Sequence, residues 1–416
     1  MREPVICGVP LDADSGITQS WLLPPGTTAC DPTGSGPGLW SFPKDVTTLD
    51  RPERHTVDNI LSTQPRCQTT TASALARSLN RTESPVKVAV VGAGAIGAYV
   101  GAALHRAGAE VHLIARGPHL AAMRRDGVRV LSPRGDFTAR PAATDDPASV
   151  GPVDYVFLGL KANSYAASGP LVHPLLHART AVIAAQNGIP WWYFHGLPGP
   201  YTGRRIESVD PGGAVSATLP PERAVGCVVY AATELESPGV VRHLEGTRFS
   251  IGEPDLTVSR RCLDFSEAMV AGGLKCPVEP DLRNDIWIKL LGNISFNPIS
   301  ALSRATMAQI CRHPDTKALV ETMMRETLAV AAAVGAHPKI SVERRIAGAE
   351  RVGDHKTSTL QDLEKGKPLE LDVLLAAVVE LAALTRTPVP KLCAVHALAD
   401  LLATTTAPAS SPGTAA

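Results

Sequence analysis

The stretch VKVAVVGAGAIGAYVGAALHRAG, residues 86–108, decides the fold class of this chain. Its first six residues form a short apolar run typical of a buried strand, and AYVGAALHRAG is typical of a helix that ends at Gly108. The turn between them has the spacing G-x-G-x-x-G, which allows a tight turn, close approach of a pyrophosphate to the backbone, and close helix packing. Unpaired N–H groups at the helix start also bind phosphate. We therefore predict a dinucleotide site formed by Gly92, Ala93, Gly94, Ala95, Ile96 and Gly97.

Three further apolar runs indicate a parallel sheet: EVHLIA at 110–115, DYVFLGL at 154–160 and TAVIAA at 180–185. Helix-length segments such as PHLAAMRRDG separate the runs, and this alternation is typical of a parallel sheet with helices on its faces. Between residues 224 and 255, Pro-Gly and Glu-Gly interrupt alternating strands, which predicts that the sheet continues with an antiparallel part. From about residue 281, nearly every segment has helical periodicity.

These patterns predict an α/β Rossmann-type N-terminal domain with an antiparallel extension, followed by an all-helical C-terminal domain. We expect the first domain at residues 86–280 and the second at 281–405. Residues 1–85 mix Pro, Gly, Thr and Asp without periodicity, which predicts a poorly ordered extension, and residues 406–416 are predicted to be a disordered tail. A targeting role for the extension, or a start codon assigned too early, stays open.

The composition of the whole chain limits the classes of partner. The 416 residues include 40 Lys and Arg against 40 Asp and Glu, so no net charge favours nucleic acid or an anionic membrane, and we expect a small-molecule partner. The eight cysteines are scattered without metal-ligand or disulfide spacing, which predicts reduced thiols in the cytoplasm and no metal site. No apolar stretch reaches the length of about 18 residues that a membrane span needs.

Polar residues after the predicted strands bear on the choice of cofactor. An NAD site places Asp or Glu at the end of the second strand, where this chain has Arg116. A guanidinium there suits a 2′-phosphate, so we expect NADP(H), that is, NADPH as reductant. Lys161 and Asn187 follow the next two predicted strands at the edge where ligands of parallel sheets bind, and we predict that both line the cofactor. An ordinary loop residue is the alternative interpretation for each of the three.

The segment IWIKLLGNISFNP, residues 286–298, carries a row of polar residues on an apolar helix. Lys289, Asn293 and Asn297 recur every four residues and form one ridge. A solvated face would explain such a ridge, but Asn297 drifts toward the buried side, and Gly292 lowers helix propensity unless something must approach closely. A lysine and two amides on one ridge can protonate an oxygen and hold a carboxylate and a hydroxyl.

In combination, these motifs resemble the ketopantoate reductase family. The resemblance spans roughly residues 86–400 and rests on GAGAIG, GLK at 159–161, QNG at 186–188, K-x-x-x-N-x-x-x-N-P at 289–298 and HKTSTLQDLEKGKPLELD at 355–372. It implies NADPH-dependent reduction of a 2-oxoacid to a 2-hydroxy acid, most specifically 2-dehydropantoate to pantoate in pantothenate and coenzyme A biosynthesis. It also implies a cytoplasmic enzyme whose active site lies between a Rossmann domain and a helical domain, and a homodimer.

The resemblance further implies roles for single residues. Lys289 would be the general acid, and Glu370 would meet substrate and cofactor in the cleft. Substrate would be bound by Asn187, Asn293, Asn297 and Ser358. Outside the glycine turn, cofactor would be bound by Arg116, Lys161, Asn187 and Ala231. For Ser358 and Glu370, the residues alone indicate only a hydroxyl at a helix start and a surface charge.

Two departures from the family pattern leave the substrate open. A segment at 189–213, with four consecutive aromatic residues at 191–194, stands in place of a short link, and it either reshapes the pocket or packs as an inserted loop. Met307 occupies a position where many members have Asn, so a polar contact to substrate is missing. The alternatives are therefore the same reaction on a different 2-oxoacid, or a catalytically idle NADP-binding regulatory protein.

Overall fold

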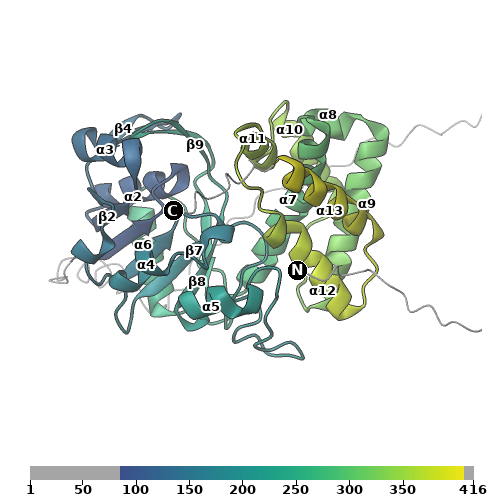
Figure 1. Cartoon of the computed structure of the whole chain (residues 1–416), viewed down its shortest axis with the longest axis horizontal. Helices are drawn as coiled ribbons and strands as arrows, with labels where there is room; N and C mark the ends of the chain where they lie inside the picture. Colours follow the sequence, from purple (N-terminus) through teal and green to yellow (C-terminus); the bar gives the residue numbers. More distant parts are fainter. Residues whose placement is uncertain (1–84, 407–416) are drawn as a thin grey trace, which may run out of the picture. The chain divides into compact units, whose positions relative to one another are not determined.

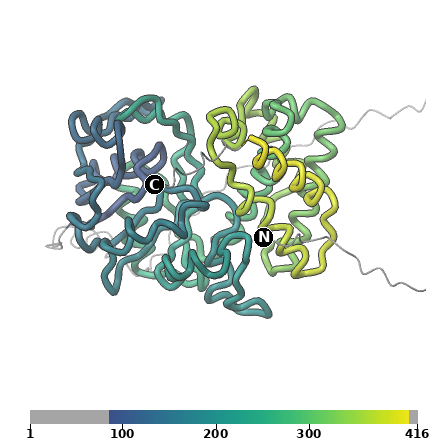
Figure 2. The backbone as a smooth tube through the Cα atoms, in the orientation of Figure 1, coloured from purple at the N-terminus to yellow at the C-terminus, as the bar shows by residue number. Residues whose placement is uncertain are grey.

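The computed structural model of the chain describes residues 85–406, which Figure 1 draws in colour and Figure 2 shows as a backbone tube. The predicted extension at 1–85 and tail at 406–416 lie outside the described residues, apart from one residue of each. Across the described range, every helix falls short of the length or the apolarity of a membrane span.

A seven-stranded sheet forms the centre of the N-terminal half of the described chain. Its strand order is β11-β8-β7-β6-β1-β2-β5, and all neighbouring pairs are parallel except β11 with β8. The strands are β1 (Lys87–Val91), β2 (Glu110–Ile114), β5 (Ala142–Thr144), β6 (Tyr155–Leu158), β7 (Ala181–Ala185), β8 (Ala224–Val229) and β11 (Phe249–Gly252). The parallel sheet predicted from the apolar runs is confirmed.

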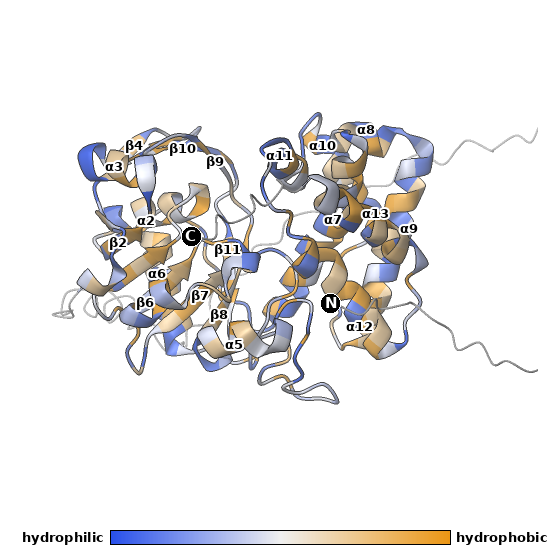
Figure 3. Cartoon of the chain, viewed as in Figure 1, coloured by the Kyte–Doolittle hydropathy of each residue, from blue (hydrophilic) through white to orange (hydrophobic). Residues whose placement is uncertain are grey.

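Alternate residues of the central strands pack into two different cores. In β1, Val88 and Val90 pack with α2 (Ala95–Arg106) and α6 (Arg260–Ala271), whereas Ala89 and Val91 face a core on the other side of the sheet. Strands that are buried on both faces are apolar throughout, which explains why these runs lack alternation. Figure 3 shows the resulting hydrophobic colouring of β6 and β7, and the hydrophilic C-terminal end of α3 (Gly117–Asp126).

A second sheet of four strands lies beside the first and was not predicted. Its order is β4-β3-β10-β9, formed by β3 (Val128–Leu131), β4 (Phe137–Ala139), β9 (Ala232–Ser237) and β10 (Val240–Glu245). The predicted antiparallel hairpin is present as β9 and β10, with Gly239 at φ +81° in its turn. However, β10 pairs with β3 rather than with the main sheet, so the antiparallel extension of the main sheet is β11 alone. The turn sequences indicate a hairpin but carry no information about its partner strand.

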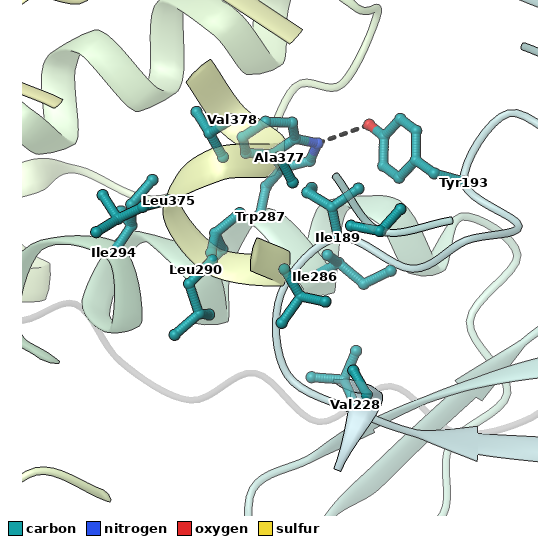
Figure 4. Close-up of a cluster of buried hydrophobic side chains, with 14 of the residues drawn as sticks. Ile189, Tyr193, Val228, Ile286, Trp287, Leu290, Ile294, Leu375, Ala377 and Val378 are labelled. Atoms are coloured by element: carbon teal, nitrogen blue, oxygen red, sulfur yellow. Dashed lines mark hydrogen bonds between the residues drawn. The ribbon is translucent and has the colours of Figure 1, made fainter. Parts of the chain in front are cut away.

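The aromatic segment at 191–194 fills the core between the sheet and the helical region. All four side chains are at most 5% exposed. The Trp191 indole donates a hydrogen bond to the Leu219 carbonyl beyond α5 (Ala214–Thr218), and the Trp287 indole donates to the Tyr193 hydroxyl at 2.7 Å (Figure 4). The buried Arg283 guanidinium donates to the Tyr193 carbonyl at 2.8 Å. Of the two interpretations of this segment, packing as an inserted loop is therefore the one that the structure supports.

The C-terminal half is helical and is organised around α7 (Leu282–Ser303). Against α7 pack α9 (Pro314–Ala333), α11 (Ser358–Glu364) and α13 (Pro390–Thr406). The remaining elements of this half are α8 (Met307–Arg312), α10 (Val342–Val352), a π-helical turn (Asp372–Ala376) and α12 (Ala377–Thr385). Helices cover α7 on several sides, and on its polar ridge Asn297 is buried while Lys289 and Asn293 are partly buried, so the ridge is not a fully solvated face.

Candidate active site

The glycine turn after β1 has the geometry of a pyrophosphate-binding turn. Gly92 has φ +88°, a left-handed conformation that L side chains rarely adopt. A Cβ on Gly97 would lie 2.3 Å from the Gly92 carbonyl oxygen, so this position needs glycine for helix packing. A Cβ on Gly94 would meet nothing within 4 Å, which leaves its backbone open on the side where a phosphate binds. The three positions therefore fit a dinucleotide: Gly92 and Gly97 need glycine for backbone conformation and packing, and Gly94 leaves space for the ligand.

His119 holds the glycine turn in place and was missed from the sequence. Its Nδ1 accepts a hydrogen bond from the Gly239 N–H at 2.9 Å, which leaves Nε2 as the donor to the Ala93 carbonyl at 2.7 Å. His119 thus connects α3, the β9–β10 hairpin and the turn. Nothing in the sequence marks this residue, because the contact depends on a hairpin more than one hundred residues away.

Arg116 lies just after the second strand, at the position predicted from the sequence. It occupies the N-cap position of α3 and is exposed to solvent. Within residues 85–406 its guanidinium has no hydrogen-bond or ion-pair partner. Its five donors are therefore available to an anionic ligand that binds beyond β2.

Two residues at the carboxyl ends of strands contact α11 and the segment that follows it. The Lys161 ammonium, after β6, donates to a carboxylate oxygen of Asp362 at 2.7 Å and to the Pro368 carbonyl at 3.1 Å. The Asn187 amide, after β7, donates to a Glu370 carboxylate oxygen at 3.2 Å. Both contacts join the sheet to the helical half. The Lys161 ammonium is ion-paired with Asp362, so it does not face a cofactor directly.

Lys289 extends from α7 to the end of β8. Its ammonium donates to the Val229 carbonyl at 2.5 Å, and Ala231, a predicted cofactor contact, lies two residues further along the chain. Burial lowers the pKa of Lys289 to about 8, and the nearby thiol of Cys227 and carboxylate of Glu370 oppose that effect only in part. Burial also raises the pKa of Cys227 well above its usual range, so its thiol stays uncharged. Glu370 is therefore the counter-charge that acts on Lys289.

The two predicted amides on α7 have no protein partner in the described part of the chain. Asn297 is 7% exposed and Asn293 is partly buried, yet neither side chain makes a hydrogen bond. Their amide groups can therefore donate to and accept from a polar ligand. Ser358 is the first residue of α11 and is exposed, with Thr357 as the capping residue, so the helix-start position is confirmed.

The structure brings several of the predicted site residues together. Lys289, Glu370 and Asn187 form one connected group, with Asn293 and Asn297 on successive turns of α7. Met307 begins α8, and its side chain packs against the hydrophobic core. No group of three His, Cys, Asp or Glu residues in the described range could hold a metal ion. The connected group can release a proton near neutral pH beside two free amides.

Comparison with known proteins identifies relatives that span the same range. The family ketopantoate reductase PanE/ApbA matches residues 88–192, and ketopantoate reductase PanE/ApbA C terminal matches residues 281–403. A 2-dehydropantoate 2-reductase of Mesorhizobium japonicum is 47% identical over 319 residues, which are 76% of this chain and 98% of that protein.

Solved structures agree with the sequence relatives. The crystal structure of 2-dehydropantoate 2-reductase from Geobacter metallireducens GS-15 has a TM-score of 0.67 and 28% identity, covering 76% of this chain and 99% of that one. A ternary structure of D-mandelate dehydrogenase with NADH and anilino(oxo)acetate has a TM-score of 0.65 at 20% identity, covers 77% of this chain and 99% of that one, and shares the fold. The chain therefore belongs to the ketopantoate reductase family, whose members are NAD(P)-dependent oxidoreductases.

Proposed function

We propose that this chain is an NADPH-dependent reductase that converts 2-dehydropantoate to pantoate. The observation that carries the proposal is Lys289, an ammonium whose pKa burial lowers to about 8, beside the Glu370 carboxylate and two amides without partners. The 47% identity to a 2-dehydropantoate 2-reductase over nearly the whole of that protein supports the substrate.

The proposed mechanism assigns the proton to Lys289. When bound, the reduced nicotinamide supplies the hydride that the keto carbon needs. Lys289 donates its ammonium proton to the keto oxygen, so the product is an alcohol and Lys289 is left neutral. Asn293 and Asn297 orient the substrate with their amide groups, and Ser358, the first residue of α11, binds it through its hydroxyl. Glu370 stabilises the ammonium before transfer and holds Asn187 in position.

Preference for NADPH is part of the same proposal. The exposed Arg116 at the end of β2 would pair with a 2′-phosphate through two parallel hydrogen bonds. The glycine turn from Gly92 to Gly97 would bind the pyrophosphate, and Ala231 would contact the cofactor near Lys289. Lys161 would reach the cofactor only by leaving Asp362, so we propose for it a role that changes on binding.

Two alternatives remain as outcomes of a test. The same chemistry on a different 2-oxoacid is favoured by Met307, which removes a polar group, although the buried aromatic segment at 191–194 no longer supports it. An idle NADP-binding protein would retain cofactor affinity without turnover. The domain division at residue 280, the homodimer and the cytoplasmic location stay predictions, and sedimentation of purified protein tests the homodimer.

An NADPH-oxidation assay over a panel of 2-oxoacids, 2-dehydropantoate included, distinguishes these possibilities. The proposal expects the highest kcat/KM with 2-dehydropantoate and its loss in Lys289→Ala. Lys317→Ala, which removes an exposed lysine on α9, is the matched control and keeps wild-type turnover. Higher kcat/KM with another 2-oxoacid would replace the substrate, and tight NADPH binding without turnover would identify an idle binder.

A further inference from the structure

Arg345 places a guanidinium without a partner against the catalytic face of α7. It projects from α10, and a Cβ on Gly292 would lie 2.0 Å from a terminal nitrogen of this guanidinium. The absence of a side chain at Gly292 thus leaves the space that the Arg345 side chain occupies. This close approach is the reason for the glycine inside α7, where it otherwise lowers helix propensity.

The surroundings of Arg345 offer no counter-charge. Its Nε is buried without a hydrogen-bond partner, and the guanidinium has no ion pair within the described residues. Asp285, one turn before Lys289, is paired with Arg248 at 2.9 Å instead. By comparison, the buried Arg283 donates to three backbone carbonyls, and Arg261 pairs with Glu253. Arginine stays charged at neutral pH even though burial lowers the pKa of Arg345, so this charge lacks compensation.

Arg345 lies close to Lys289 along α7, as a group that binds the carboxylate of a 2-oxoacid should. Gly292 lies about one helical turn after Lys289 and directly before Asn293. In a 2-oxoacid the carboxylate is bonded to the keto carbon, so its oxygens lie within a few ångströms of the oxygen that Lys289 protonates. A carboxylate also accepts two parallel hydrogen bonds from a guanidinium, which fixes the plane of the keto group.

We propose that Arg345 binds the substrate carboxylate and thereby selects 2-oxoacids over neutral ketones. The inference rests on the proposed 2-oxoacid reduction and deepens it. The two cations then have different roles. Lys289 donates its proton to the keto oxygen, whereas Arg345 stays protonated and binds the carboxylate. Gly292 is a specificity residue in the same arrangement, because it admits the guanidinium to the face of α7.

The test compares steady-state kinetics of Arg345→Gln, Arg345→Lys and Arg344→Ala. Arg344 is the neighbouring, exposed residue of α10 and serves as the control. Loss of charge-assisted hydrogen bonds predicts that KM for 2-dehydropantoate rises about 10- to 150-fold in Arg345→Gln, with kcat little changed. The lysine variant should recover part of the affinity, and the control should match wild type. The primary amide of the substrate, used as a competitive inhibitor, lacks the charge, so its inhibition constant should not change in Arg345→Gln.

A second variant separates binding from folding. Gly292→Ala displaces only the flexible end of Arg345 and should reproduce the rise in KM for the acid, again without affecting the amide. Equal weakening of acid and amide would overturn the proposal in favour of a structural role. A higher Kd for NADPH with an unchanged KM would move Arg345 to the cofactor. If wild-type protein reduces no 2-oxoacid, the proposed function itself fails, whereas normal wild-type turnover with an unaffected Arg345→Gln refutes only the role of Arg345.

Discussion

In the proposed mechanism, burial of the Lys289 ammonium prepares it for proton transfer. An exposed lysine holds its proton so firmly at neutral pH that it is a poor acid. Burial destabilises the ammonium and lowers the pKa of Lys289 to about 8, while the Val229 carbonyl and the Glu370 carboxylate keep the charged form populated below that pH. The balance leaves the ammonium charged in neutral solution and ready to lose its proton.

This balance predicts a pH profile. If Lys289 is the acid, kcat/KM for 2-dehydropantoate reduction should be level below about pH 8 and fall about tenfold per pH unit above it, because the protonated form is the active one. Lys289→Ala should lower kcat by about 100- to 10,000-fold and remove the descending limb. Lys317→Ala should keep both. If kcat/KM instead decreased as the pH was lowered from 8 and stayed level above pH 8, Lys289 would be excluded as the proton donor.

Arg116 carries the prediction about cofactor choice. Removing the guanidinium in Arg116→Ser should reduce the preference for NADPH over NADH by about tenfold or more, since charge-assisted hydrogen bonds are lost only with the phosphorylated cofactor. Arg124→Ser, at the other end of α3 and paired with Asp145, is the control. The measurement is the ratio of kcat/KM for the two cofactors. An unchanged ratio would show that another group reads the 2′ position.

Single residues differ in how far the sequence indicates their proposed roles. Lys289, Asn293 and Asn297 were found by helical spacing, because a four-residue repeat places them on one ridge. Ser358 and Glu370 were found only through resemblance, and Glu370 meets Asn187 across 183 positions of sequence. His119 and Arg345 were not found at all, since each acts through a neighbour that only the tertiary fold supplies.

At the level of elements, the turn after β7 packs against the π-helical turn at Asp372–Ala376. The Ile189 N–H donates to the Val373 carbonyl at 2.9 Å, and a Cβ on Gly188 would lie 2.1 Å from that same carbonyl oxygen. Gly188 also has φ +75°. This contact holds the turn in place. Asn187, directly before Gly188, is thereby positioned to donate to Glu370, which lies three residues before Val373.

Gly188→Ala should therefore lower the stability of the fold and displace Asn187 from Glu370. We expect the free energy of unfolding to fall by about 2–5 kcal/mol, from left-handed strain together with a backbone clash. Gly203→Ala is the matched control: Gly203 has φ +68° with nothing within 4 Å of a Cβ, so the loss should be about 1 kcal/mol. Urea denaturation measures both. Similar losses in the two variants would mean that the turn can move away from Val373.

Elements were easier to predict than their pairing. The strands and the long helices were recognisable from periodicity, and α7 even continues through Pro298 to Ser303 because the surrounding helices hold it. The four-stranded sheet was not recognisable, because β3 and β10 are separated by more than one hundred residues and pair in parallel. Pairing between distant strands depends on the whole fold rather than on local sequence.

For the whole molecule, the described residues contain every group that we assign to catalysis. The 319 residues aligned with the Mesorhizobium japonicum protein cover 98% of it. We therefore predict that deletion of residues 1–84 leaves kcat/KM for 2-dehydropantoate unchanged within error and preserves the thermal unfolding midpoint of the remaining protein. Full-length protein is the control. A loss of turnover in the shortened protein would assign a catalytic or folding role to the deleted segment.

The buried aromatic segment has a practical consequence. Trp191, Trp192 and Trp287 are three of the five tryptophans of the chain, and each is at most 5% exposed. Reduced nicotinamide absorbs light in the range where indole emits, and the oxidised form does not. The protein therefore carries internal donors for energy transfer, so that quenching of its own fluorescence reports arrival of the reduced cofactor and recovery of the emission reports its oxidation, without any added label.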